Sequence, residues 1–508
     1  MTTTPTEIYD HWIGGASFAG SGDRLGDIYD PARGAVAKQV RLASVADVEA
    51  AVASAHQAAT TWSKSSVTVR SRVMFAFREL LVQHEDELAA LISAEHGKTL
   101  DDARGEVVRG REVVEFACGI PQLLKGEYSD QVSSGVDSYS FRQPLGVVAG
   151  ITPFNFPIMV PLWMHPVAIA CGNTFVLKPS ERVPGASDLV ARLYQQAGLP
   201  DGVFNVLHGD KVAVDALLEH PDIDAVSFVG STPIARYVHE GASRTGKRVQ
   251  ALGGAKNHAV VMPDADLDFA ADHLVAAGYG SAGQRCMAIS AVVAVGPTAD
   301  TLVDKVRSRT LDLKIGAGTE PGVDMGPVIS AASRDRIVDL IGQGEQAGAK
   351  VVVDGRELVR DATRPDELRD GFFVGPTLID HATTDMSAYT EEIFGPVLTV
   401  LRVDTLQEAL AVVNGNQYGN GTAVFTSSGE VARTFQREVT VGMIGINVPV
   451  PVPMAFHSFG GWKDSLFGDH HIHGPEGVRF YTRAKVVSSR WPHVSEESLA
   501  QLNFPTAH

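Results

Sequence analysis

Short apolar strands alternate with helical segments from residue 157 to about residue 243, and this rhythm constrains the fold more than any other feature. Such alternation is typical of a parallel, doubly wound sheet with helices on both faces. The sequence therefore predicts an α/β fold. The expected strands are 173–180, 202–209 and 223–230, and the expected helices lie near 187–197, 211–220 and 233–243.

A second round of strands predicts a second α/β unit, and a chain of 508 residues is long enough for two packed domains. Glycine-rich segments at 253–254 and 441–447 are the expected crossings between the two units. The strands of the second unit are expected near 257–262, 289–295, 398–403 and 421–426. Before the first unit, hydrophobic spacing predicts helices at 45–62, 66–96 and 100–118 and a strand over 138–153.

The longest apolar run, residues 158–177, approaches the roughly 20 residues that a membrane-spanning helix needs. Two prolines, a histidine and an asparagine interrupt it, so a buried helix leading into a buried strand is the better interpretation. The first residues lack the basic and apolar regions of a targeting signal, and three scattered cysteines favour a reducing compartment. A net charge of −17 argues against binding to nucleic acid. We therefore expect a cytoplasmic protein with no nucleic-acid or membrane partner.

The segment GQRCMA, residues 283–288, places Arg285 directly before Cys286. A free cysteine is most often a small core residue, but a neighbouring guanidinium stabilises the nucleophilic thiolate. The segment ITPFNFP, residues 151–157, holds Asn155 between aromatic residues and prolines. Its amide suits either the stabilisation of an oxyanion or the closing of an Asx turn. Each segment alone leaves both interpretations open.

Two further segments follow the ends of predicted strands, where open α/β sheets bind ligands. In SFVGSTPIARYV, Gly230 and Ser231 precede a helix whose free N–H groups suit a pyrophosphate, although an ordinary capped helix fits as well. In LKPSER, Lys178 and Glu181 either bind ribose hydroxyls or form a surface ion pair.

Three histidines lie together in GDHHIHG. The spacing of His470, His471 and His473 fits no zinc motif, and no nearby cysteine completes one. A polar loop or a subunit contact is the better interpretation, and we expect no metal site.

The order of these segments is more specific than any one of them. PFNFP, LKPSE, FVGST, LGG, GQRC and EEIFGPV together resemble the aldehyde dehydrogenase superfamily, over about residues 10 to 490. The longer segments GGAKNH, QRCMA and INVPVPVP are similar to its branch of CoA-acylating methylmalonate-semialdehyde dehydrogenases. This resemblance implies an NAD-dependent homotetramer or dimer that uses coenzyme A as co-substrate and acts on a small carboxylated aldehyde.

The resemblance also implies the aldehyde dehydrogenase fold and a division of the chain. It combines a Rossmann-like NAD-binding domain, an α/β catalytic domain and a small β oligomerisation element. The expected parts are 1–126 and 145–252 for NAD binding, 127–144 and 478–495 for oligomerisation, 253–445 for catalysis, and 446–477 as the return to the NAD-binding domain.

By the same resemblance, Cys286 is the nucleophile, and Asn155 and the Cys286 backbone N–H form the oxyanion hole. Arg285 and Arg109 are expected to bind the substrate carboxylate, because guanidinium groups bind carboxylates through paired hydrogen bonds. Arg111, on the same predicted helix, is the alternative to Arg109. The expected NAD site consists of Thr152, Phe154, Lys178, Glu181, Arg182, Gly230, Ser231, Gly253, Glu392 and Phe394.

Two positions depart from the superfamily pattern. Ala235 stands where the usual turn has a second glycine, and Ala251 stands directly before Leu-Gly-Gly, where hydrolytic members carry a glutamate. That glutamate activates water, whose bulk pKa of about 15.7 makes a base necessary, whereas a thiol with a pKa of roughly 8.5 needs none. The sequence thus predicts oxidative decarboxylation of methylmalonate or malonate semialdehyde to propionyl-CoA or acetyl-CoA through a Cys286 thioester. The alternative is a hydrolysing enzyme such as a succinate-semialdehyde dehydrogenase.

Overall fold

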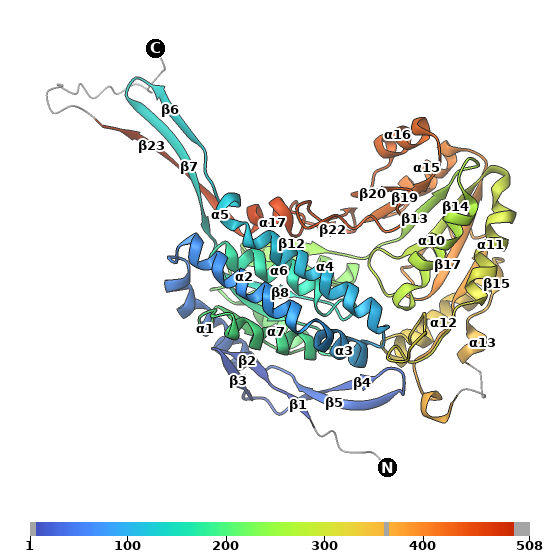
Figure 1. The fold of residues 1–508 in the computed structure, drawn as a ribbon, viewed down its shortest axis with the longest axis horizontal. Helices are drawn as coiled ribbons and strands as arrows, with labels where there is room; N and C mark the ends of the chain where they lie inside the picture. The colour runs from blue at the N-terminus through green and yellow to red at the C-terminus, as the bar shows by residue number, and fades with distance from the viewer. Residues whose placement is uncertain (1–6, 360–364, 492–508) are drawn as a thin grey trace.

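The computed structural model describes residues 7–359 and 365–491. Two large sheets, each covered by helices, form two lobes, and a narrow three-stranded arm projects from the first lobe (Figure 1). Within the described ranges, no helix is long and apolar enough to cross a membrane. The apolar run 158–177 instead forms a buried helix that leads into a buried strand, as expected.

The first lobe is built on an eight-stranded sheet whose five central strands, β12 to β10 in the order below, are parallel. Strands β8 and β11 are neighbours in the sheet although β9 and β10 lie between them in sequence, so the topological switch point falls between β8 and β11. In sheet order the strands are β22 (Leu466–Phe467), β12 (Arg248–Leu252), β11 (Ala225–Val229), β8 (Val147–Ile151), β9 (Thr174–Lys178), β10 (Phe204–Val206), β2 (His11–Ile13) and β3 (Ala16–Phe18).

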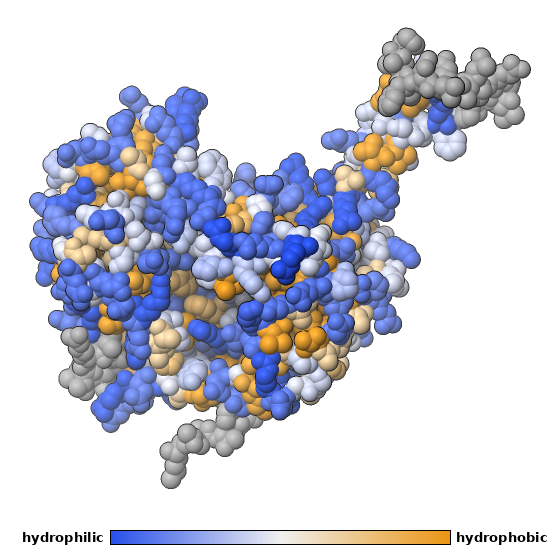
Figure 2. Space-filling view, turned by 180° about the vertical axis from the view of Figure 1, so that it is seen from behind, coloured by the Kyte–Doolittle hydropathy of each residue, from blue (hydrophilic) through white to orange (hydrophobic). Residues whose placement is uncertain are grey.

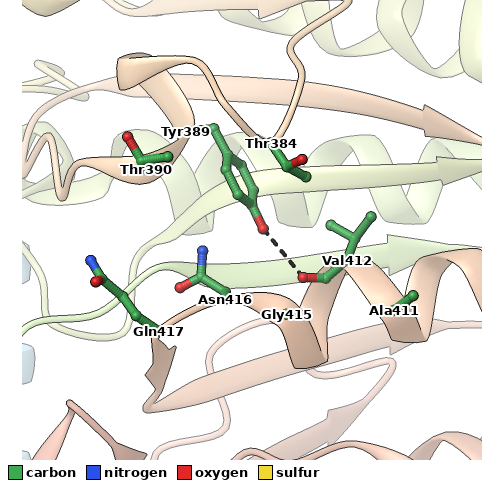
Figure 3. A pocket seen from close by; sticks show the side chains of 8 residues that line it. All are labelled: Thr384, Tyr389, Thr390, Ala411, Val412, Gly415, Asn416 and Gln417. Carbon is green, nitrogen blue, oxygen red and sulfur yellow. Dashed lines mark hydrogen bonds between the residues drawn. The ribbon is translucent and has the colours of Figure 1, made fainter.

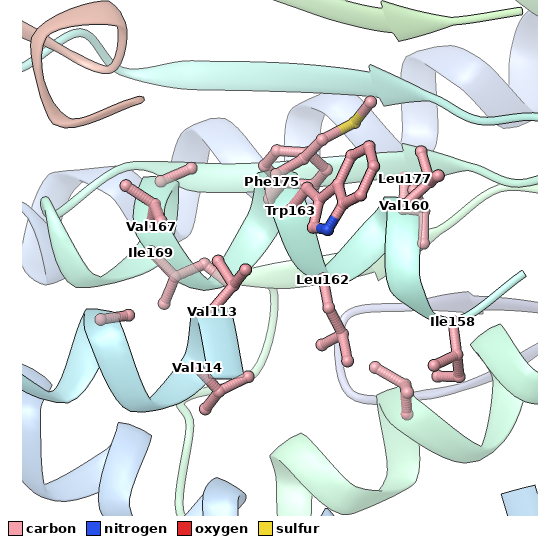
Figure 4. Close-up of a cluster of buried hydrophobic side chains, with 14 of the residues drawn as sticks. Val113, Val114, Ile158, Val160, Leu162, Trp163, Val167, Ile169, Phe175 and Leu177 are labelled. Carbon is pink, nitrogen blue, oxygen red and sulfur yellow. The ribbon is translucent and has the colours of Figure 1, made fainter. Parts of the chain in front are cut away.

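Alternate residues of these strands face two separate apolar cores, because successive side chains of a strand point to opposite faces. Figure 4 shows the first core, where side chains of α4, α6 and β9 meet. This core is covered mainly by α2 (Val67–Gln83), α3 (Glu85–His96), α4 (Leu100–Cys118), α5 (Ile120–Leu123), α6 (Met159–Ala170), α7 (Gly185–Gln196) and α17 (Gly474–Phe480). The second core is covered by α1 (Val45–Trp62), α8 (Lys211–Glu219) and α9 (Thr232–Arg244).

The second lobe has a seven-stranded sheet that is parallel except for its edge strand β15. Its order is β15 (Lys350–Val353), β16 (Thr377–Asp380), β17 (Val397–Val403), β14 (Ile289–Val295), β13 (Asn257–Val261), β19 (Gly421–Phe425) and β20 (Met443–Ile446). One face packs on α10 (Leu267–Tyr279), α11 (Ala299–Leu311), α12 (Ala331–Gln346) and α14 (Ser387–Thr390), and the other on α15 (Leu406–Gly415) and α16 (Gly429–Glu438).

The remaining elements are small. The arm is an antiparallel sheet of β6 (Tyr128–Ser133), β7 (Val136–Pro144) and β23 (Thr482–Arg490), and apolar side chains are exposed along it (Figure 2). A separate N-terminal sheet contains β1 (Ile8–Tyr9), β5 (Ala35–Arg41) and β4 (Leu25–Asp30). The rest are β18 (Tyr418–Gly419), β21 (Trp462–Lys463), α13 (Arg356–Val359), and the 3-10 helices η1 (Gly280–Gly283), η2 (Gly296–Thr298) and η3 (Asp366–Leu368).

The expected helices 45–62 and 100–118 are confirmed, but two other expected elements are divided. The helix expected at 66–96 breaks at His84, because the three acidic residues that follow favour a new helix N-terminus there. The strand expected at 138–153 divides at Gly146, whose φ of +142° sends β7 into the arm and β8 into the first sheet. The expected crossing at 441–447 contains β20, so the chain leaves the second sheet only after Ile446.

Candidate active site

A cleft of about 400 Å³ opens where β8, β11 and β12 end, which includes the switch point of the first sheet. It brings together eight of the expected site residues: Phe154, Asn155, Gly230, Ser231, Gly253, Cys286, Glu392 and Phe394. Arg336 and Tyr418 lie in no quoted motif, and the other six missed residues stand in motifs where only their neighbours were assigned a role. Sequence reasoning thus assigned no role to eight lining residues. These are Pro153, Val229, Thr232, Pro233, Gly254, Arg336, Glu391 and Tyr418.

The loop that carries Cys286 begins with a left-handed turn. Residues 281–283 have φ values of 54°, 51° and 70°, and two of the three are not glycine. Such backbone costs roughly 1–3 kcal/mol per non-glycine residue and persists only where the surroundings enforce it. The side-chain amides of Asn257 and Asn420 donate to the Cys286 carbonyl at 2.9 and 3.0 Å. The backbone at the nucleophile is therefore held from two sides.

Asn155 lies beside this loop. Its Nδ2 donates to the carbonyl of Gln284 at 3.1 Å, two residues before Cys286. This contact spans 129 residues, so the amide is directed at the cysteine loop rather than at a local Asx turn. A side-chain N–H fixed next to a nucleophile is the arrangement that stabilises an oxyanion.

The surroundings of Cys286 favour its neutral thiol over the thiolate. Burial and the Glu392 carboxylate raise the pKa of its thiol to about 12, while the N–H groups of Cys286 and Met287 and the charge of Arg285 act in the opposite direction. Burial also raises the pKa of Glu392 to about 7. The negative charge of Glu392 therefore opposes formation of the thiolate that an attack on a carbonyl requires.

The wall formed by α9 and residues 253–254 is packed closely enough to require glycine. A Cβ on Gly253 would lie 2.6 Å from the carbonyl of Asp464, and one on Gly254 would lie 2.3 Å from Glu392. Thr232 Oγ1 accepts a hydrogen bond from the Gly254 N–H at 2.8 Å, which ties this turn to the start of α9. Ser231, the N-cap residue, makes no side-chain capping bond, so N–H groups at the helix start face the cleft free of such a partner.

Four further residues expected at the NAD site lie at the ends of β8 and β9. Lys178 is buried at the end of β9, and its Nζ lies 3.2 Å from Glu181. The Thr152 hydroxyl is buried and has no partner. The Arg182 guanidinium lies 5.8 Å from the ring centre of Phe154, a lining residue of the cleft. The assignment of these four residues to a nucleotide site stays a prediction.

The three arginines discussed for the substrate differ in their surroundings. Arg109 donates to the carbonyls of Val452 and Pro453 at 3.2 and 3.0 Å, in a segment that packs against the same core as Cys286. Arg111 instead pairs with Glu85 on α3, 2.5 Å away. Because Arg111 is directed into the helical layer, Arg109 is the better placed of the two.

Arg285 is already engaged. Its guanidinium lies 2.5 Å from Asp102 of α4, and it lines a cavity of only about 20 Å³ next to Cys286. A carboxylate ligand at Arg285 must therefore share this cation with Asp102.

The side-chain directions along strand β12 bear on the assignment of Ala251 as the position where hydrolytic members carry a glutamate. Ala251 pairs with Phe228 and faces the second core, under α9. Leu252 pairs with Val229 and faces the first core, against which Cys286 packs. A glutamate at position 251 would point away from the cysteine, so the hypothesis that Ala251 marks the site of the base is wrong. The residue on the Cys286 side is Leu252, which is apolar. Ala235 also faces the second core, so the methyl group at this departure from the pattern points away from the cleft.

The three histidines do not converge. His470 contacts Glu476 at 3.2 Å, while the buried His473 packs against Trp163. In the part of the chain that is described, no group of three or more such side chains is placed to hold a metal. A larger cavity, of about 550 Å³, lies between α14 and α15 and contains none of the expected site residues (Figure 3).

A cysteine and an amide thus meet beside a switch-point cleft, which suits thiol-dependent chemistry on a carbonyl. The chain belongs to the aldehyde dehydrogenase family, whose sequence profile matches residues 18–487. It is 53% identical to malonate-semialdehyde dehydrogenase of Pseudomonas aeruginosa, over 98% of this chain and 99% of the relative. It is 49% identical to malonate-semialdehyde dehydrogenase 2 of Geobacillus kaustophilus, over 96% of this chain and 100% of the relative.

Two solved structures show the same fold. Methylmalonate-semialdehyde dehydrogenase from Oceanimonas doudoroffii superposes with a TM-score of 0.94 and 55% identity, covering 96% of this chain and 99% of that one. A putative methylmalonate-semialdehyde dehydrogenase from Sinorhizobium meliloti, complexed with NAD, gives a TM-score of 0.94 at 52% identity, with 97% and 99% covered. The expected aldehyde dehydrogenase fold is thereby confirmed.

Proposed function

We propose that this enzyme oxidises and decarboxylates malonate and methylmalonate semialdehyde, with NAD as oxidant, and transfers the acyl group to coenzyme A. The observation that carries the proposal is the pairing of Cys286 and Asn155 at a nucleotide-type cleft. The residue of β12 that faces the core against which Cys286 packs is the apolar Leu252 rather than an acid. The two malonate-semialdehyde dehydrogenases that are about 50% identical to this chain support the substrate class.

The cleft fits NAD. The start of α9 offers N–H groups and a positive helix end for a pyrophosphate, and Gly230 and Gly253 allow close approach. Lys178 and Glu181 at the end of β9, with Glu392 and Phe394 at the far wall, would hold the two riboses and the nicotinamide. NAD, when bound, supplies the acceptor for the hydride that leaves the substrate carbon.

The chain's own residues perform the remaining steps. The Cys286 thiol releases its proton to water, and the Sγ of the thiolate then attacks the aldehyde carbon while Asn155 Nδ2 donates to the oxygen that gains charge. After oxidation the carbon is held as a thioester on Cys286. The bond to the substrate's carboxylate carbon then breaks, CO2 leaves, and its electron pair enters the thioester carbonyl, where the same N–H groups hold the enolate oxygen. Protonation of the α-carbon gives an acyl thioester, and the CoA thiolate displaces Cys286.

The substrate carboxylate requires a cation. We assign Arg109 to this role, with Arg285 as a second contact that Asp102 partly neutralises. The Arg109 side chain is already oriented by the 452–453 carbonyls and by Glu112, so little rotamer freedom is lost on binding.

The test is CoA dependence. With malonate semialdehyde and NAD alone, we expect one burst of NADH per active site, and sustained NADH formation only after CoA is added. Cys286→Ala serves as the control without a nucleophile. Sustained turnover to a free acid in the absence of CoA would overturn the proposal and favour a hydrolysing semialdehyde dehydrogenase. A preference for succinate semialdehyde would do the same.

We also propose that the arm assembles subunits into a dimer or tetramer. Val486 and Tyr128 are 69% and 63% exposed there, and β6 and β23 are the edge strands of its sheet. Sedimentation of wild type and Val486→Asp should show a loss of assembly in the variant. A wild-type protein that sediments as a monomer would exclude this role.

A further inference from the structure

A fully buried ion pair lies directly behind the oxyanion donor. The side chains of Lys98 and Glu106 are both 0% exposed, and Lys98 Nζ lies 2.8 Å from Glu106 Oε2. Lys98 Nζ also donates to the backbone carbonyl of Asn155 at 2.7 Å and lies 4.3 Å from the ring centre of Phe156. The ammonium group therefore joins the start of α4 to the loop that carries Asn155.

Glu106 completes the attachment on the other side of that loop. Its Oε1 accepts from the N–H groups of Ile158 and Met159 at 2.8 and 3.2 Å, at the start of α6. The segment between Asn155 and Met159 is thus held at both of its ends by one ion pair. Buried charges are costly unless every partner is in place, and here the pair satisfies backbone groups that otherwise have no helical partner.

From these contacts we propose that Lys98 and Glu106 are positioning residues for the oxyanion donor, an inference that rests on the proposed role of Asn155. Displacement of the Asn155 backbone by a fraction of an ångström moves its Nδ2 away from the developing alkoxide. Neither charge touches the substrate. The direct contact of this ion pair with the site is to the backbone of Asn155.

The test is a double-mutant cycle on the pre-steady-state burst of NADH. Lys98→Met alone leaves a buried carboxylate uncompensated, so the main variant is Lys98→Met/Glu106→Gln, which removes both charges. We expect it to slow the burst at least about 10-fold, within the roughly 10²–10³-fold loss expected of Asn155→Ala. Combined with Asn155→Ala, the same pair of substitutions should slow the burst by less than about 3-fold more.

Alkylation of Cys286 by iodoacetamide gives a second readout, because this reaction forms no oxyanion. Its rate should stay within about 3-fold of wild type, whereas a general loss of structure changes it. Arg104→Ala is the matched control. The Arg104 side chain lies on α4, is 43% exposed and forms an ion pair with Asp86, so its loss should leave the burst unchanged.

Two results overturn the inference. One is an equal loss of burst rate in the wild-type and Asn155→Ala backgrounds, which indicates a role that does not act through Asn155. The other is a parallel loss of alkylation and burst. A normal burst in Asn155→Ala itself is a different failure, since it removes the proposed oxyanion donor and this inference with it.

Discussion

The choice between water and coenzyme A should depend on which face of β12 carries an acid. We compare Leu252→Glu with Ala251→Glu, which place the same carboxylate at adjacent positions on opposite faces of one strand. Leu252 faces the core against which Cys286 packs, so a glutamate there is directed toward the acyl-enzyme. The same group at position 251 is directed into the core under α9.

The expected magnitudes follow from burial. Ala251 has no exposed surface, so a glutamate there is overpacked by about 1–3 kcal/mol. Its carboxyl pKa would rise by roughly 3–5 units from about 4.3, so the group is protonated in the folded protein at pH 7, and this adds about 3–4 kcal/mol. Leu252 is only 2% exposed, so Leu252→Glu has a similar cost of burying a carboxyl and also loses about 2–3 kcal/mol of apolar burial. It supplies a base, however, and general base catalysis contributes roughly 10²–10⁴-fold.

The assay is steady-state NADH formation from malonate semialdehyde without CoA. Leu252→Glu should raise this rate about 100-fold or more above wild type, and Leu252→Gln, which has nearly the same shape but no base, should not. Ala251→Glu should lower the melting temperature strongly and leave the CoA-independent rate unchanged. CoA-independent turnover in a folded Ala251→Glu, but not in Leu252→Glu, would refute the assignment of the two faces.

Three further outcomes are expected. Removing the charge in Glu392→Gln should lower the pKa of Cys286 from about 12 and speed its alkylation at pH 8; an unchanged rate would exclude an electrostatic effect of Glu392. Arg109→Ala should raise KM for malonate semialdehyde far more than for propanal, whereas Arg111→Ala should change both little; equal effects on both aldehydes would remove Arg109 from carboxylate binding. Burial lowers the pKa of Lys256 from 10.5 to about 7. Between these two pH values Lys256 is protonated in the unfolded chain and neutral in the folded protein, so the free energy of unfolding should rise with pH. Denaturation midpoints measured at pH 7 and 9 should show this rise in wild type and lose it in Lys256→Met.

The sequence identified the fold and half of the residues that line the cleft, because those signals are local. Strand–helix alternation predicts a parallel sheet, and ligands bind where parallel strands end, so Gly230 follows directly from the expected strand 223–230, whereas Gly253 was expected only from the family resemblance. Cys286 and Asn155 are 131 positions apart in the chain, and only the conserved order of landmarks in a family resemblance could pair them before their shared cleft was seen.

What the sequence could not supply is orientation. A one-residue offset on a strand moves a side chain to the opposite face, and a motif anchored on Leu-Gly-Gly does not fix that offset. The same limit applies to Arg109 and Arg111, whose partners lie in the 452–453 segment and on α3, both distant in sequence. The ion pair of Lys98 and Glu106 gave no signal, because a charged pair eight residues apart is most often a solvated one.

The proposed nucleophile and the proposed oxyanion donor come from different lobes, and residues 98–102, around the N-terminus of α4, contact both loops. Asn155 lies on the loop after β8 in the first lobe, while Cys286 precedes β14 in the second. Lys98, two residues before α4, donates to the Asn155 carbonyl, and Asp102, in the first turn of α4, accepts from Arg285, the neighbour of the cysteine. Together with the hydrogen bond from Asn155 Nδ2 to the Gln284 carbonyl, these contacts tie the two loops to each other and to the N-terminus of α4. A ligand that shifts one loop relative to the other must therefore break at least one of these three contacts.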